Sequence, residues 1–370
     1  MPHTENDRTL RNLIAILLIA ASISGCLGEE DATSDDEVAI QPDPDPVPDP
    51  DPVPDPDPVP DPDPVPDPDP VPDPDPVPPP ASGSTFPGVP EYRYRDQLPD
   101  LGDPVDVTSC SANGTNVNGT PDDWVVVTLN QNTGCEISGS YFSVQNSTLN
   151  HRLDLSGGPY AVRNNEINSP GTGGALNPGG TDILIEGNVV RDNGIIPSST
   201  DRHGMNVRGS ASGLWILENS IYQNSGDAIQ FCHGCVGGTH NGPAFVYIAG
   251  NVMHDDEENA IDLKEFLGPV VVVCNEMYGY ERGQFSGNGE AVRINDEGQQ
   301  GQVWFAHNNY HDNRTDIAPY GSDAEGYFLD ENTTKVNNSN SNSVFASGAA
   351  AQPYYDQYQA QYGLDLSDGC

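Results

Sequence analysis

Short apolar segments recur along most of the chain, and each is closed by an asparagine, one further residue and another apolar residue. Segments such as ILIEGNVV and VYIAGNVM carry this pattern at Asn188, Asn219, Asn251, Asn275 and Asn308, with weaker copies at Asn146 and Asn165. The copies are roughly 19 to 33 residues apart, which is the period of a solenoid coil. Each segment is short, β-branched and bounded by Gly, Asn, Asp or Pro, so the pattern predicts strands.

Coils of this size cannot bury their apolar face alone, so successive coils must stack. Stacking in register places the repeated asparagines above one another, where they form a hydrogen-bonded ladder. We therefore expect an all-β solenoid with an Asn ladder, and the asparagines need no further role.

A second strand repeats within the coils, in HGMNVR (203–208), DAIQFC (227–232), NAIDLK (259–264) and EAVRIN (290–295). Alternation turns the apolar residues inward and leaves the polar ones in outward columns. One column is Asn206, Gln230, Asp262 and Arg293; the next is Arg208, Cys232, Lys264 and Asn295; the turn before contributes His203, Asp227, Asn259 and Glu290. This polar face, carried by a rigid sheet, is the expected functional site.

The first 85 residues differ from the solenoid. Residues 1–25 have a basic start and a short apolar core, which is typical of a secretory signal, and residues 23–26 resemble a bacterial lipobox ending in Cys26. Lipidation of Cys26 would anchor the chain to a membrane surface, and the absence of Asp after it is compatible with sorting to the outer membrane or cell surface. An Asp-Pro-Asp-Pro-Val-Pro repeat fills most of residues 26–85, which predicts a disordered, extended tether; a Pro-rich docking motif is the alternative.

Residues 86–335 are expected to form the solenoid, and residues 336–370, which include several tyrosines, a cap or tail. Those tyrosines could equally stack on sugars. The formal net charge of −42 argues against nucleic acid or an anionic membrane surface as a partner. Membrane contact is therefore expected through the lipid alone. We expect the protein to be a monomer.

Six cysteines besides Cys26 form an even set in an exported chain, which favours disulfides: Cys110, Cys135, Cys232, Cys235, Cys274 and Cys370. A Cys110–Cys135 bridge fits the first coil. The Cys232-x-x-Cys235 spacing with His240 nearby also suits zinc, although the oxidising compartment favours disulfides.

The coil period, the asparagines and segments such as ENAIDLK (258–264) resemble the right-handed parallel β-helix proteins of the pectate-lyase-like superfamily, over roughly residues 100–335. This resemblance implies a single-stranded right-handed parallel β-helix. In polysaccharide lyases of this fold, a basic residue removes the proton beside a uronate carboxylate, whose charge calcium or an arginine neutralises.

Carried onto this sequence, the resemblance makes Lys264 the base, with Arg293 and Arg208 as nearby cations. It offers Asp227, Glu257, Glu258 and Asp262 as oxygen ligands for Ca²⁺. The spacing Glu257-x-Asn259-x₄-Lys264 is similar to that of alginate lyases and chondroitinase-B-like enzymes, whereas residues 258–262 are similar to the calcium strand of a pectate lyase family, with Glu and Asn where Asp is expected.

Two other functions stay open. A glycoside hydrolase would pair Asp227 with Asp255, Asp256 or Asp262. A surface-displayed glycan-binding or adhesion protein would use exposed aromatic side chains, whereas the predicted columns offer charges and amides. The expected partner is an acidic polysaccharide, and the expected activity is a calcium-assisted lyase.

Overall fold

The computed structural model describes residues 86–101, 110–131, 133–170, 173–197, 200–232, 242–281, 289–294, 302–319, 326–328, 334–336, 346 and 348–370. The predicted signal segment, Cys26 and the proline-rich spacer lie outside these residues. No helix among the described residues is long and apolar enough to span a membrane.

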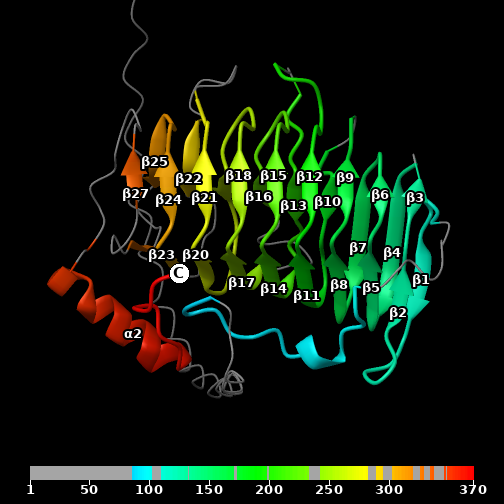
Figure 1. The fold of residues 1–370 in the computed structure, drawn as a ribbon, viewed down its shortest axis with the longest axis horizontal. Coiled ribbons are helices and arrows are strands. Elements are labelled where there is room, and N and C mark those ends of the chain that lie inside the picture. The colour runs from blue at the N-terminus through cyan, green and yellow to red at the C-terminus, as the bar shows by residue number, and fades with distance from the viewer. Residues whose placement is uncertain are drawn as a thin grey trace, which may run out of the picture. The chain divides into compact units, whose positions relative to one another are not determined.

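Three parallel sheets of nine strands each build the molecule, and successive strands pass from one sheet to the next (Figure 1). The first sheet contains β1 (Thr115–Asn118), β4 (Cys135–Ser140), β7 (Leu153–Gly157), β10 (Leu176–Asn177), β13 (Met205–Val207), β16 (Ile229–Phe231), β19 (Ile261–Leu263), β22 (Glu290–Ile294) and β25 (Thr315–Pro319). The second contains β2 (Val125–Val127), β5 (Phe142–Gln145), β8 (Tyr160–Arg163), β11 (Thr181–Glu186), β14 (Ser212–Leu217), β17 (Ala244–Ala249), β20 (Val270–Val273), β23 (Val303–Ala306) and β26 (Gly326–Phe328). The third contains β3 (Asn130–Gln131), β6 (Thr148–Leu149), β9 (Glu166–Asn168), β12 (Val189–Arg191), β15 (Ser220–Tyr222), β18 (Val252–His254), β21 (Glu276–Tyr278), β24 (Asn309–His311) and β27 (Thr334–Val336). This is a right-handed parallel β-helix, as predicted.

The Asn ladder runs along one corner of the coils. Asn165, Asn188, Asn219, Asn251 and Asn275 each donate from the backbone N–H and the side-chain amide to the side-chain oxygen of the next member, and Asn308 ends the series. The prediction of Asn146 as a member is wrong. Ser147 takes that place and donates its backbone N–H to Asn165 Oδ1 at 2.9 Å. The apolar residue falls two positions after Ser147, at Leu149, so Ser147 rather than Asn146 keeps the spacing of the repeat.

The outer face of the second sheet is apolar and covered. Its outward column includes Trp215, Tyr247 and Trp304, which pack with the N-terminal segment and with the C-terminal helix α2 (Gln352–Tyr362). Tyr358 of α2 lies edge-to-face with Trp304, at 4.9 Å between ring centroids. Two short 3-10 helices, η1 (Arg95–Gln97) and η2 (Gly348–Ala350), complete the described elements. The C-terminal helix thus packs against the outer face of the second sheet, and its buried tyrosines, Tyr355 and Tyr358, contribute to this packing.

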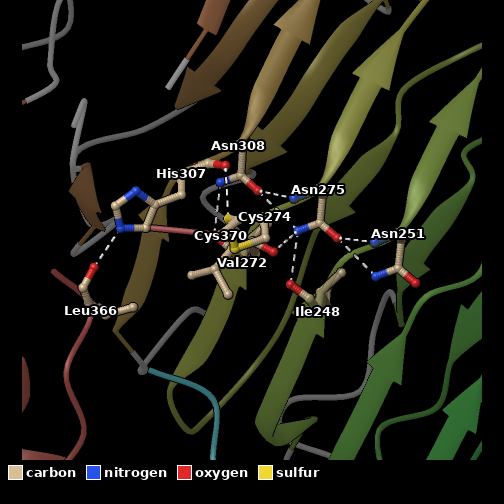
Figure 2. Close-up of a disulfide and its surroundings, with 10 residues drawn as sticks. Ile248, Asn251, Val272, Cys274, Asn275, His307, Asn308, Leu366 and Cys370 are labelled. Carbon is tan, nitrogen blue, oxygen red and sulfur yellow. Dashed lines mark hydrogen bonds between the residues drawn. A yellow bond between two sulfur atoms is a disulfide. The ribbon is translucent and has the colours of Figure 1, made fainter. Parts of the chain in front are cut away.

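The five expected cysteines within the described residues are all disulfide-bonded. Cys110 bonds Cys135, as predicted for the first coil. Cys274, at the end of β20, bonds Cys370 in the tail after α2, beside the ladder residues Asn251 and Asn275 (Figure 2). Cys232 is disulfide-bonded too, which leaves its sulfur unavailable for zinc, while Cys235 and His240 lie outside the described residues.

Candidate functional site on the first sheet

Polar side chains line the outer face of the first sheet in the predicted register. Strand pairing aligns Asn206 with Gln230, Gln230 with Asp262, and Asp262 with Arg293. The residues between them face the core and are fully buried, namely Met205, Val207, Ile229, Phe231, Ile261, Leu263, Val292 and Ile294. The alternation therefore fixes which side chains are available for chemistry.

A second ladder forms at the turn before these strands. The backbone N–H of Asp227 donates to His203 Nδ1 at 3.0 Å, the side-chain amide of Asn259 donates to Asp227 Oδ1 at 2.7 Å, and the backbone N–H of Glu290 donates to Asn259 Oδ1 at 3.1 Å. Gly226 makes room for this turn, because a Cβ there would lie 2.7 Å from His203 Nδ1. The predicted turn column is confirmed, and it holds three ionisable residues, His203, Asp227 and Glu290, in fixed positions.

Two members of this ladder, His203 and Asp227, meet Asp201 and Glu258 in one cluster, which we call the carboxylate–histidine cluster. One ligand atom from each lies within 4.8 Å of every other. His203 Nε2 is 3.3 Å from Asp201 Oδ1, and Nδ1 is 3.1 Å from Asp227 Oδ2. All except Asp201 are buried, so the cluster opens to solvent on the Asp201 side.

Burial and mutual repulsion perturb the acidic groups strongly. Burial, with the Asp227 and Asp201 charges, raises the pKa of Glu258 to about 9, and burial with the Asp227 charge raises the pKa of Asp262 to about 7. Burial also opposes ionisation of Asp227, but the charge of the adjacent His203 and the hydrogen bond from Asn259 hold its pKa below the ordinary value. For His203, burial would lower the pKa, and the Asp227 carboxylate more than offsets this, so the pKa is raised. Such opposed perturbations within one cluster are typical of functional sites.

Lys264 lies beside this cluster. Its Nζ is 3.6 Å from Asp262 Oδ2, and its charge acts on Asp201, His203 and Asp227 as well. The side chain is 21% exposed, which leaves the ammonium accessible to a ligand. Arg293 stands one coil further on, in register with Asp262.

Two predicted site residues lie elsewhere. Arg208 extends away from Lys264 and donates to Asp154 Oδ1, on β7, at 2.5 Å. Glu257 is buried beside Glu258, and its backbone N–H donates to the backbone carbonyl of Asn224, but it is not a member of the cluster. Thus Asp227, Glu258, Asp262, Lys264 and Arg293 come together, whereas Arg208 and Glu257 do not.

Of the three carboxylate pairs proposed for a glycoside hydrolase, the structure supports only that of Asp227 with Asp262. Asp256 is buried in a separate ladder, where it accepts from Asn224 at 2.7 Å and from the Tyr280 hydroxyl at 2.6 Å. Asp255 binds His254 on the third-sheet side. Asp262 is the partner that stays beside Asp227.

Asp201 and His203 are the members of the cluster that were not predicted as ligands or catalytic residues. His203 stood in the predicted turn column with Asp227, and this shared position was a usable signal. Asp201 lies in the loop before β13, where the sequence has no periodic pattern from which the orientation of its side chain could be predicted.

The cluster fits a cation by its donor set. Asp201 and Glu258 of the cluster, together with Asp262 beside it, offer carboxylate oxygens, which hard cations such as Ca²⁺ prefer. The raised pKa values of Glu258 and Asp262 reflect crowded negative charge that a bound cation would relieve. Asp227 is a poorer ligand than predicted, because Gln230 and Asn259 already donate to its two oxygens.

Comparison with known proteins shows no matching family model and no matching curated protein. Among solved structures, pectate lyase Pel9A is similar at 12% identity and a TM-score of 0.43, over 66% of this chain and 68% of that one. The A-module of the mannuronan C-5 epimerase AlgE6 from Azotobacter vinelandii is similar at 14% identity and a TM-score of 0.28, over 63% of this chain and 77% of that one. These likenesses concern the coil architecture, and no residue role follows from them.

Proposed function

We propose that this chain is a polysaccharide lyase that cleaves a uronate-containing glycan by β-elimination, with Lys264 as the base. The observation that carries this proposal is Lys264 on a rigid outward position, next to an acidic cluster, with Arg293 one coil further on in the neighbouring column. A binding surface would not require buried carboxylates whose charge is so costly to maintain.

In the proposed reaction, Nζ of Lys264 takes the proton on the carbon next to the uronate carboxylate. The electron pair left behind forms a carbon–carbon double bond and the glycosidic carbon–oxygen bond breaks. The base is the neutral amine of Lys264; the leaving oxygen takes a proton from water, and Lys264 returns its proton to solvent. Arg293 binds and orients the uronate carboxylate, while Asp227 holds His203 and Asn259 in place. Ca²⁺, held by Asp201, Glu258 and Asp262, would supply the positive charge that makes this proton acidic.

The test is a lyase assay on alginate, pectate and chondroitin-type polymers, with and without calcium, following the absorbance of new unsaturated chain ends. Loss of a positioned base costs about 10²- to 10⁴-fold in rate, so Lys264→Ala should reduce turnover by at least that range. The control is Arg191→Ala, because Arg191 pairs with Glu166 on the third sheet, away from the cluster. Undiminished turnover by Lys264→Ala would overturn the assignment of the base.

Calcium has its own arm in the same assay. Chelation should abolish turnover, and Glu258→Gln should raise the calcium concentration needed to restore it, while leaving the unfolding temperature unchanged or higher. Equal calcium requirements in Glu258→Gln and the wild type would contradict the proposed ligand set.

We further propose that the protein is exported and held at a bacterial outer membrane or cell surface by lipid on Cys26, with the proline-rich segment as its tether. Metabolic labelling with a fatty acid should mark the wild type and not Cys26→Ser. Equal labelling of the two would refute the anchor.

A further inference from the structure

Four aromatic side chains form a continuous stack on the outer face of the third sheet. We call Tyr222, His254, Tyr278 and His311 the ring column; they come from β15, β18, β21 and β24 and are paired in register. Adjacent ring centroids are 4.8, 4.8 and 4.7 Å apart, with planes within 8° of parallel. Since each inner ring is covered by neighbours on both faces, the ring edges are what meets solvent.

The edges of the ring column are polar and partly open. His254 Nδ1 lies 2.9 Å from Asp255 Oδ2, and His311 Nδ1 lies 2.8 Å from Asp312 Oδ2. A carboxylate at Nδ1 favours the tautomer with the proton there, which leaves Nε2 as an acceptor. His311 Nε2 also lies 3.3 Å from Glu276. Among the described residues, Nε2 of His254 and the hydroxyls of Tyr222 and Tyr278 have no hydrogen-bonding partner.

This surface offers one donor or acceptor per coil, in a straight line parallel to the coil axis. A hydroxyl-rich chain with one repeating unit per coil matches that arrangement, because each hydroxyl can both donate to Nε2 and accept from a tyrosine. Asp255, Asp312 and Glu276 border the line and would repel a polyanion. The second sheet has no comparable open face, because α2 and the N-terminal segment cover it.

We propose that the ring column is a second glycan-binding surface, separate from the carboxylate–histidine cluster, that takes an uncharged polysaccharide lying along the third sheet. It does not depend on lyase activity. A tethered enzyme with such a surface would hold one glycan of a mixed matrix while acting on an acidic one.

The experiment is affinity electrophoresis of the full chain in gels containing soluble mannan, xylan or β-glucan, with an alginate gel for comparison. The test variant carries Tyr222→Phe, His254→Phe and Tyr278→Phe, which keeps four stacked rings and removes the three polar edge atoms without partners, together with the His254 Nδ1 contact to Asp255. At least one neutral glycan should retard the wild type, and the variant should bind it about tenfold to hundredfold more weakly.

Two controls keep the outcome specific. Tyr354→Phe, on α2, should bind as the wild type does. Lys264→Ala should retain full neutral-glycan binding even if it has no lyase activity, so the failure of either proposal can be told from the failure of the other. Equal retardation of the wild type and the triple variant, or no retardation by any neutral glycan, would overturn this proposal.

Discussion

At the scale of single residues, the chain uses one geometry for two purposes. Asn, Asp and His side chains at corner positions accept backbone N–H groups from the preceding or following coil, which satisfies donors that would otherwise be buried without partners. Asn251 and Asp227 both do this, yet Asp227 also joins an ionisable cluster. A polar residue at a corner of the coil therefore has a structural role unless other charged side chains lie next to it, as they do at Asp227.

Asp256 tests the structural case. Burial, partly opposed by hydrogen bonds from Tyr280 and Asn224, raises its pKa to about 7 from an ordinary 3.8. The folded protein therefore favours the protonated form of the Asp256 carboxyl group. The contribution of this group to the free energy of unfolding is complete below pH ~4 and is lost as the pH rises towards 7. Asp256→Asn should be more stable than the wild type at pH 8, by an amount on the order of 4 kcal/mol, and about equal to it at pH 4.

Chemical denaturation of both proteins from pH 4 to pH 8 measures this difference. The comparison cancels the other groups that titrate in the same range, among them Asp262 and His203. Parallel stability curves for the two proteins would show that Asp256 is not held protonated.

At the scale of elements, each strand is marginal and the ladders connect them. Asn251 Nδ2 donates to Ile216, Ala249 and Asn275, and its Oδ1 accepts from Asn219. Truncation leaves several of these groups buried without partners, and each costs about 1–3 kcal/mol. We expect Asn251→Ala to lower the free energy of unfolding by at least ~3 kcal/mol.

The matched control is Asn168→Ala, at an outward, half-buried position of β9 on the third sheet. Urea unfolding of both variants gives the comparison, and Asn168→Ala should stay within about 0.5 kcal/mol of the wild type. Similar losses in the two variants would mean that the ladder contributes no more than an ordinary surface amide.

The positions of residues that follow the periodic sequence pattern could be predicted, whereas the positions of residues that depend on tertiary contacts could not. Alternation identified the outward position of Asp262 and Lys264, and the repeat identified the ladder from Asn165 onwards. The ladder position of Ser147 was misassigned because two adjacent polar residues fit the pattern almost equally. Arg208 shares a predicted column with Lys264, but its long side chain pairs with Asp154 on β7, which also pairs with Arg152.

At the scale of the whole molecule, the segments that cover the second sheet could not be predicted from the sequence. Its outward column carries Trp215, Tyr247 and Trp304. Such a column of large aromatic residues indicates that this face is buried, but it does not indicate which segment of the chain packs against it. The cover comes from both ends of the described chain, for Tyr358 of α2 donates to the carbonyl of Gly88. Such contacts between residues 270 positions apart have no local signature.

The Cys274–Cys370 disulfide fixes that cover in place, since it joins the tail after α2 to the end of β20 (Figure 2). Next to it, His307 Nε2 lies 2.6 Å from the Leu366 carbonyl, and Leu366 itself is fully buried. The bridge spans 96 residues of sequence, and disulfides of this kind typically contribute about 2–4 kcal/mol by limiting the unfolded chain. Cys370→Ser should lose about that much stability, and the loss should appear first where the tail meets the second sheet.

Two measurements on Cys370→Ser resolve this order. Trp304 is fully buried against Tyr358, so undocking of α2 should shift tryptophan emission to longer wavelength before the β-sheet circular dichroism signal falls. Limited proteolysis should cut the variant within residues 346–370 under conditions that spare the wild type and the Ser367→Ala control. A single transition by both probes, with an intact tail, would mean that α2 is held by its aromatic packing alone and that the disulfide acts on the unfolded chain only.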